Sequence, residues 1–249
     1  MKQISYFTLI AGTVASLIIS GCSKKTTTPD NPAAASASAP SITISDGFGA
    51  LAAVRSVSYT TVAGLTIPLE INTAVAVFPT ASGATTFNDG GTVTLNTKAL
   101  TKSTNNTYSY QNLTNPLSFT QITWNVTGSS SVPAISYTDN KPIPDFSGFS
   151  TLPTAITRAS GVTISLGNAI TNADSVYVVV ADFNSHSILK RLAGNAGQCD
   201  FSSAELSGFT AGQGMVQVCP WNLTSEDFSS KKFYFIIETA YTKQGITIN

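Results

Sequence analysis

Histidine, the side chain most often used in acid–base catalysis, occurs once in the 249-residue sequence. His186 stands between Ser185 and Ser187, and a Ser/His/Asp hydrolase needs a nucleophile and an acid assembled around such an imidazole. Neither a Gly-x-Ser-x-Gly motif nor a second histidine accompanies it. The pattern therefore favours a solvated residue of a hairpin turn and predicts no catalytic residue.

Carboxyl groups offer a second chemistry, because two of them held at a fixed separation hydrolyse glycosidic bonds. The thirteen Asp and Glu residues show no spacing that singles out such a pair. Scattered acidic residues of this kind are typical of solvated turns. We therefore predict a non-catalytic protein, with a hydrolase that acts on glycans through paired carboxylates as the alternative.

Two groups of turn residues carry the hard oxygen ligands that Ca²⁺ prefers. They are Asn88-Asp89-Gly90-Gly91, and Asp139-Asn140 with Asp145. The same residue types tolerate positive φ and cap local backbone groups, so turns explain them equally well. The Asp-x-Asp-x-Asp-Gly ladder of calcium loops is missing from the sequence. We expect no cofactor and no metal site, and calcium is the less favoured alternative.

The start of the chain has the pattern of an export signal. Lys2 supplies a positive charge, and residues 6–19 form an apolar run of about 14 residues, too short to span a bilayer as a helix. The run closes on Ile19-Ser20-Gly21-Cys22. This segment resembles the type II signal peptide and lipobox of bacterial lipoproteins, with Ile19 where the motif usually has Leu. The folded part resembles no specific family.

The resemblance implies that residues 1–21 are removed and that Cys22 is lipidated, with a diacylglyceryl group and an acyl chain such as palmitate. Several acyl chains on one N-terminus hold a protein stably on a membrane. Ser23 follows where Asp would resemble an inner-membrane retention signal. The resemblance therefore favours a lipid anchor in the outer membrane, and both the periplasmic face and the cell surface stay open.

Cys199 and Cys219 are the other two thiols of the chain. The exported location that the resemblance implies is oxidising, so we expect a disulfide between them. It would close a loop of about 21 residues and stabilise the fold by about 3 kcal/mol in the chain-entropy model. Two buried free thiols are the alternative. A metal site on this pair lacks further soft ligands at a recognisable spacing.

Composition limits the partners. Charged residues make up 10% of the chain and the formal net charge is zero, so the sequence has no electrostatic footprint for nucleic acid. We expect the membrane, through the lipid, and a glycan or an envelope protein as partners. Residues 22–45 lack apolar periodicity and are typical of a disordered tether, which would hold the folded part roughly 25 Å from the lipid.

Beyond the tether, short segments alternate apolar and polar residues, which predicts antiparallel strands. Residues 46–140 form the first expected β domain. Ile122, Trp124 and Val126 share one face of a half-buried strand there, and Trp124 is expected in the core. A second alternating set is Leu69, Ile71, Thr73, Val75 and Val77. The prolines of residues 133–153 interrupt the pattern, which places a boundary near Asn140.

Residues 141–249 form the second expected domain. Strands are expected at 162–166, 176–180, 188–192, 215–219, 232–240 and 245–248. This strand count is similar to that of an immunoglobulin-like or fibronectin-III-like sandwich, without the hallmark Cys-Trp-Cys order. The sequence therefore predicts an all-β protein of two antiparallel, sandwich-like domains.

Two functional classes follow from these features. The favoured one is a lipid-anchored, non-catalytic envelope protein that binds a glycan or protein partner, or acts as a structural or adhesive surface element. Glycan binding needs exposed aromatic rings, and the rings nearest to turns are those of Tyr108, Tyr110, Tyr137 and Trp221. Packing against neighbouring strands is their alternative role. The other class is an envelope hydrolase.

The lipid anchor can be tested at one atom. A Cys22→Ala variant lacks the thiol that takes the lipid, so we expect it to leave the membrane fraction and to incorporate no labelled palmitate. Fractionation and palmitate labelling of whole cells measure both effects. A Cys22→Ala protein that still sediments with membranes, beside an unlabelled wild type, would contradict the anchor.

Overall fold

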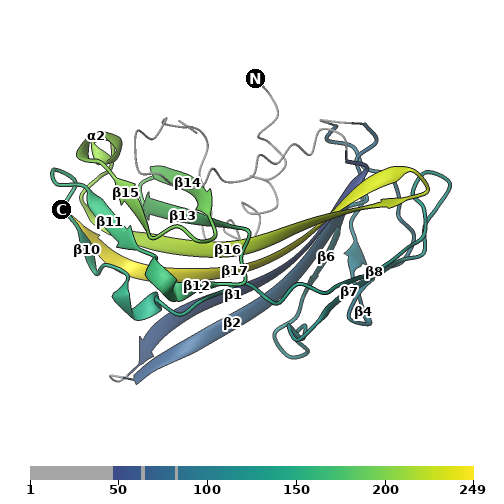
Figure 1. Cartoon of the computed structure of the whole chain (residues 1–249), viewed down its shortest axis with the longest axis horizontal. Coiled ribbons are helices and arrows are strands. Elements are labelled where there is room, and N and C mark those ends of the chain that lie inside the picture. Colours follow the sequence, from purple (N-terminus) through teal and green to yellow (C-terminus); the bar gives the residue numbers. More distant parts are fainter. Residues whose placement is uncertain (1–46, 63–64, 82–83) are drawn as a thin grey trace.

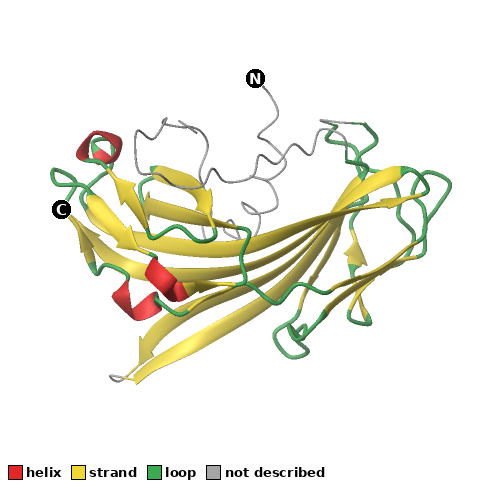
Figure 2. Ribbon diagram, in the orientation of Figure 1, coloured by secondary structure: helices red, strands yellow, loops and turns green. Residues whose placement is uncertain are grey.

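The computed structural model describes residues 47–62, 65–81 and 84–249. This part of the chain is nearly all strand, and helix is confined to short single turns (Figure 2). The predicted all-β class is therefore confirmed. The export signal, Cys22 and the tether of residues 22–45 lie outside the described residues. A search of the described part finds no helix long and apolar enough to cross a membrane.

One nine-stranded sheet runs through the molecule in the order β14-β13-β16-β17-β1-β2-β6-β5, with β10 also pairing with β17. Its longest strands lie side by side along a curved surface (Figure 1). The strands of this sheet are β1 (Gly49–Val62), β2 (Leu65–Val77), β5 (Thr101–Lys102), β6 (Tyr108–Gln111), β10 (Ala155–Ile156), β13 (Ser175–Asp182), β14 (Ser187–Ala193), β16 (Gly212–Phe228) and β17 (Lys231–Ile248).

Strands from both ends of the sequence alternate within this sheet. β1 pairs in parallel with β17 over ten residue pairs from Gly49↔Phe233 to Ser58↔Thr242, while β2 pairs antiparallel with β1. The expected division into separate sandwiches, 46–140 and 141–249, therefore needs correction, because both segments supply strands to one sheet. The finer likeness to an immunoglobulin or fibronectin-III domain stays a prediction.

Smaller elements cover this sheet in two groups. A four-stranded sheet, β4-β3-β7-β8, packs near one end, and two two-stranded sheets with short helices pack near the other (Figure 1). The first group is β3 (Val93–Leu95), β4 (Lys98–Ala99), β7 (Ile122–Val126) and β8 (Ile135–Asp139). The second is β9 (Asp145–Phe146), η1 (Phe149–Thr151), β11 (Val162–Ser165), η2 (Gly167–Ala169), β12 (Ile170–Thr171), β15 (Gln198–Phe201) and α2 (Ser203–Leu206).

Both groups cover the same face of the long sheet. Phe235 and Ile237 of β17 lie in the core under the four-stranded sheet, whereas Tyr241 lies in the core of the second group. These residues are separated by even numbers, and side chains of a strand alternate between its two faces. One face of β17 therefore serves two apolar cores in succession.

A polar row across this face separates the two cores. Arg55 of β1 is the cross-strand neighbour of Asn72 on β2 and of Thr239 on β17. The Arg55 guanidinium donates to Tyr241 Oη at 2.9 Å and to Asp145 Oδ1 at 3.1 Å, and the Tyr241 hydroxyl donates to the same carboxylate. The Nη2 group of Arg55 is thereby paired at the boundary between the two covering groups, while its Nε is buried without a hydrogen-bond partner.

The expected alternation is confirmed on β7, where Trp124 is fully buried. On β2 the expected apolar set shares one face, of which Val77 lies in a small core with Ala52 and Ile236 whereas Leu69 is 49% exposed. Ala74 and Ala76 on the opposite face enter the core under the four-stranded sheet. The two strands expected at 232–240 and 245–248 are one strand, β17. A register shift at Gly214/Met215 of β16 lets the pairing continue through the irregular part.

A shared sheet predicts cooperative unfolding. Ile164→Ala in the second core and Leu95→Ala in the first each remove a buried side chain and cost about 3 kcal/mol. Because both cores rest on β17, we expect each variant to lower the midpoint of one common transition, followed by circular dichroism in urea. Two transitions, each shifted by only one of the variants, would contradict a single folding unit.

Candidate functional site

His186 lies in the hairpin between β13 and β14, as the sequence predicts. Its ring Nδ1 is 2.8 Å from Asp182 Oδ2, and the ring is 46% exposed while the Asp182 side chain is fully buried. An acid–histidine pair of this kind orients the imidazole in many hydrolases. Within the described residues, Asp182 is the one hydrogen-bond partner of the ring, so no nucleophile completes the set.

The Asp182 carboxylate is occupied by the turn itself. It accepts from the backbone N–H groups of Asn184, His186 and Thr210 at 2.7–2.9 Å. Burial raises the pKa of Asp182, but the N–H groups of Thr210 and His186 and the His186 ring outweigh burial and hold it below its ordinary value. The pair therefore locks the hairpin to the loop before β16.

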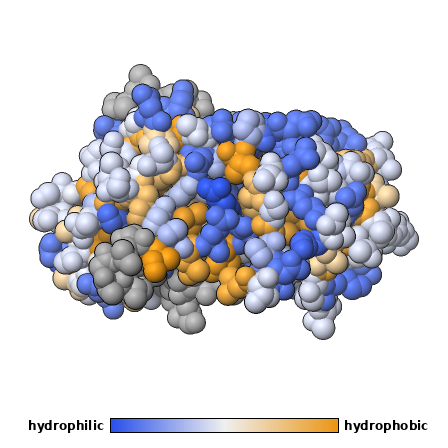
Figure 3. All heavy atoms as spheres, turned by 90° about the horizontal axis from the view of Figure 1, so that it is seen from below, coloured by the Kyte–Doolittle hydropathy of each residue, from blue (hydrophilic) through white to orange (hydrophobic). Residues whose placement is uncertain are grey.

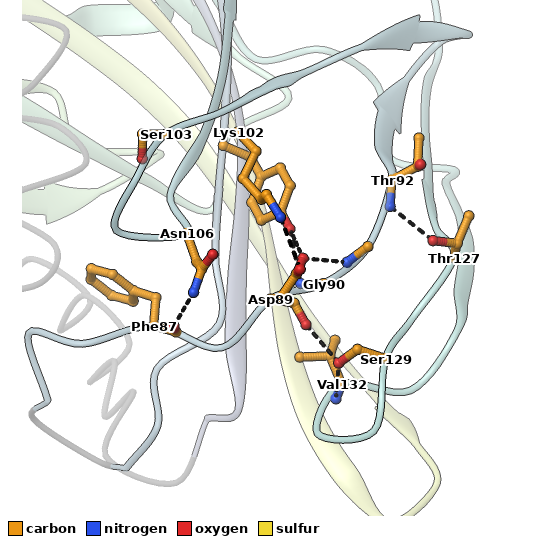
Figure 4. A network of polar contacts seen from close by, with 12 residues as sticks. Phe87, Asp89, Gly90, Thr92, Lys102, Ser103, Asn106, Thr127, Ser129 and Val132 are labelled. Atoms are coloured by element: carbon orange, nitrogen blue, oxygen red, sulfur yellow. Dashed lines mark hydrogen bonds and ion pairs between the residues drawn. The ribbon is translucent and has the colours of Figure 1, made fainter.

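Asp89, expected in a turn or at a calcium site, is held by protein donors. Lys102 Nζ lies 2.8 Å from Oδ2, and the Tyr108 hydroxyl and the Gly91 N–H donate to Oδ1 (Figure 4). The hydrogen bonds from Lys102 and Tyr108 hold the pKa of Asp89 well below its usual range. Ser129 Oγ donates to the Asp89 carbonyl at 2.6 Å. This network joins the loop of Asp89 to β5, β6 and the loop of Ser129, and the Asp89 carboxylate already has protein partners.

The other carboxylates considered for calcium also have local partners. Asp139 Oδ1 accepts from the Lys141 N–H at 2.8 Å, and Asp145 pairs with Arg55. Among the described residues, no three His, Cys, Asp or Glu side chains group as a metal site. The arrangement at these positions is that of turns and an ion pair.

The four aromatic residues considered for glycan binding pack against other groups. Tyr108 and Trp221 are about 1% exposed, and Trp221 stacks on Tyr177 with ring centroids 5.3 Å apart. Tyr137 stacks on Phe235 at 3.7 Å. Tyr110 is partly buried and donates from its hydroxyl to the Asn115 carbonyl. The structure does not bring the four rings together on one surface.

The expected disulfide between Cys199 and Cys219 is wrong, since both thiols are free and buried. Cys199 lies in the second core together with Val218 of β16. Because consecutive residues of a strand point to opposite faces, Cys219 lies on the far side of the sheet from Cys199. Burial raises the pKa of Cys199 to about 12 and that of Cys219 well above its ordinary value, so both stay as thiols.

Glu238, which the sequence analysis did not single out, is a buried carboxyl group in the middle of β17. It is 7% exposed, with Trp221 and Val54 as its cross-strand neighbours, and it forms a side-chain hydrogen bond with Cys219. Burial raises its pKa to about 7. No cation pairs with it in the described part of the chain. In the sequence, the buried carboxyl group could have been recognised as a lone Glu within the apolar run of residues 233–241.

The outer part of β2 is a strand edge that lies next to exposed apolar residues. β6 pairs with β2 only from Thr73 to Ala76, so no described strand lies beside residues 65–71 on that side. Ile67 is 47% and Leu69 is 49% exposed, and they share one face. Figure 3 views the molecule from the side where β2 lies lowest in Figure 1, and apolar surface there is interspersed with polar residues.

Comparisons with known proteins identify no relative. No family model matches the chain, and neither the curated proteins nor the solved structures include a significant match.

The raised pKa of Glu238 predicts a pH-dependent stability. The carboxyl group ionises near pH 4.5 when unfolded and near pH 7 when folded, so folding is favoured by its protonated form. Stability should fall by up to about 3 kcal/mol as the pH rises from 4.5 to above 7. Glu238→Gln should remove this slope in urea titrations at pH 5 and pH 8.

The matched control is Glu226→Gln, which changes an exposed carboxyl group on neighbouring β16. It should leave the slope in place. An equal pH dependence in wild type and Glu238→Gln would show that Glu238 is not the group responsible.

Proposed function

We propose that this chain is a lipid-anchored, non-catalytic protein of the bacterial outer membrane that works by associating with protein through the open edge of β2. The resemblance of Ile19-Ser20-Gly21-Cys22 to a lipobox supports the anchor. The tether of residues 22–45 would let the folded part reach partners near the membrane.

The binding role rests on one observation. Main-chain groups and apolar side chains are exposed at the same place on β2. An unpaired strand presents a row of N–H and C=O groups that another extended chain can complete. Residues 65–71 of β2 offer such a row, and Ile67 and Leu69 add apolar surface next to it. Main-chain pairing would supply affinity there, and the two side chains would supply specificity.

The hydrolase alternative draws no support from the acidic residues with the clearest local geometry. The carboxylates of Asp89 and Asp182 accept hydrogen bonds from nearby protein groups, and that of Asp145 forms an ion pair with Arg55. A glycosidase needs two carboxyl groups that face a shared cleft across the substrate. Glycan binding as the main role is likewise less favoured, because Trp221 and Tyr108 are buried.

The edge can be tested in living cells by site-specific photocrosslinking. A benzoylphenylalanine introduced at Leu69 of the full-length chain should yield a covalent adduct with a protein on irradiation. The same probe at Phe183, which is 51% exposed in the hairpin next to the opposite edge strand β14, is the matched control and should yield none. Gel shift and mass spectrometry detect the adduct.

Equal adducts at positions 69 and 183 would indicate random collision. The absence of any adduct at position 69 in intact cells would overturn β2 as a contact surface.

A further inference from the structure

We propose that residues 41–45 of this chain, Ser41-Ile42-Thr43-Ile44-Ser45, pack across the far face of the long sheet, which is the face opposite the two covering groups. The inference goes beyond the proposed function, because it concerns how the tether joins the folded part. It does not rest on the open edge of β2.

The far face is apolar and buried in its middle. Side chains alternate along a strand, so the residues next to those of the two large cores belong to this face. Five of them, on three neighbouring strands, are 0–3% exposed: Ala52 and Val54 of β1, Ile236 and Ala240 of β17, and Cys219 of β16. Neighbours within one sheet shield side chains laterally but leave their outer ends open. Burial this complete requires a second layer.

The far face is open elsewhere, which limits the extent of this second layer. Leu69 on β2 is 49% exposed and Leu189 on β14 is 43% exposed, and both belong to the far face. A side chain of this face therefore stays accessible where only its own sheet surrounds it. The second layer covers the central strands β16, β17 and β1 and stops short of the two edges.

Described residues supply only one end of the second layer. Phe87, from the loop after β2, lies in a small core with Ala52 and Ile236. Among the described residues it is the one member of that core from outside the long sheet. Glu238 lies further along β17 and is 7% exposed, although a carboxyl group on an open face would stay in water. The layer above Glu238 therefore comes from another segment.

The segment before Gly47 starts next to this face. The Phe48 N–H donates to the Lys232 carbonyl at 2.8 Å, which fixes this part of the chain beside the beginning of β17. Asp46-Gly47 is a dipeptide typical of turns, so the preceding residues can reverse over the sheet. Five extended residues span about 17 Å, which equals the distance along β1 from Gly49 to Val54. Residues 41–45 thus reach the middle of the far face.

The sequence of this segment fits an apolar surface. Ile42 and Ile44 are the only large apolar residues between Cys22 and Gly47. Their spacing of two places both on one face of an extended segment, while Thr43 points the other way, toward water. No apolar period repeats over the tether as a whole, but its last residues carry this one pair. Docking of the pair shortens the tether to residues 22–40, which then leaves the fold on the far face.

Two native thiols report on this cover. Cys219 lies on the far face and Cys199 in the second core, and both are buried and free. We expect Ile42→Ser with Ile44→Ser, in the full-length chain in membranes, to speed alkylation of Cys219 by iodoacetamide about tenfold, because the open face becomes more populated. Cys199 should keep its rate. Mass spectrometry of the alkylated peptides over time measures both rates.

The matched control is Ala35→Ser with Ala37→Ser, which places the same side chains at the same spacing elsewhere in the tether. It should leave both alkylation rates unchanged. An unchanged rate at Cys219 in the variant with Ile42→Ser and Ile44→Ser would overturn the proposal.

A second measurement locates the segment directly. Benzoylphenylalanine at Ile44 should yield a crosslink within one chain, mapped by mass spectrometry to residues 52–54 or 236–240, and the same probe at Ala35 should yield none there. Where the double variant loosens the whole fold and both thiols react alike, this crosslink decides. A crosslink to any other part of the chain, to another molecule, or no crosslink at all would overturn the proposal and leave the role of the β2 edge untouched.

Discussion

The length of the hairpin formed by β16 and β17 is the constraint on which the rest of the structure depends. β17 has 18 residues, which corresponds to about 60 Å of extended chain. Side chains alternate along this whole length, so one strand carries an apolar face far longer than a single small sheet can cover. Two covering groups bury the apolar face of β17 in succession. A polar row lies between them, in which Arg55 forms hydrogen bonds with Asp145 and Tyr241.

The size of the side chains determines how closely the four-stranded sheet packs against the long sheet. The long sheet contributes Ala53, Ala74 and Ala76 to this core, and all three are fully buried. The four-stranded sheet contributes large side chains, among them Trp124 and Leu95. Small residues on β1 and β2, beside large ones on β17 and on the four-stranded sheet, allow close packing. The alanines of β1 and β2 thus lie in the same core as Trp124, and the larger apolar residues of β2 lie on its other face.

Local features were predictable from the sequence, and long-range pairing was not. Alternation identified β7 and the hairpin of His186, because both depend on residues close together in the chain. The parallel pairing of β1 with β17 joins residues about 180 positions apart, and no local pattern encodes it. The disulfide was misjudged for a different reason. Compartment and spacing suggested a bond, whereas strand alternation beside Val218 turns Cys219 away from Cys199.

The same alternation explains why the candidate site was placed on the wrong groups. Aromatic rings near turns looked available, yet Trp221 on the long strand β16 and Tyr108 on the short strand β6 are both buried. Leu69 belongs to an alternating apolar set, and such a pattern shows which residues share a face but not which face is covered. The open edge of β2 begins where β6 stops pairing with it, at Thr73. Beyond that point the outer part of β2 has one strand neighbour among the described residues, and an edge of this kind can pair with water or with another extended segment.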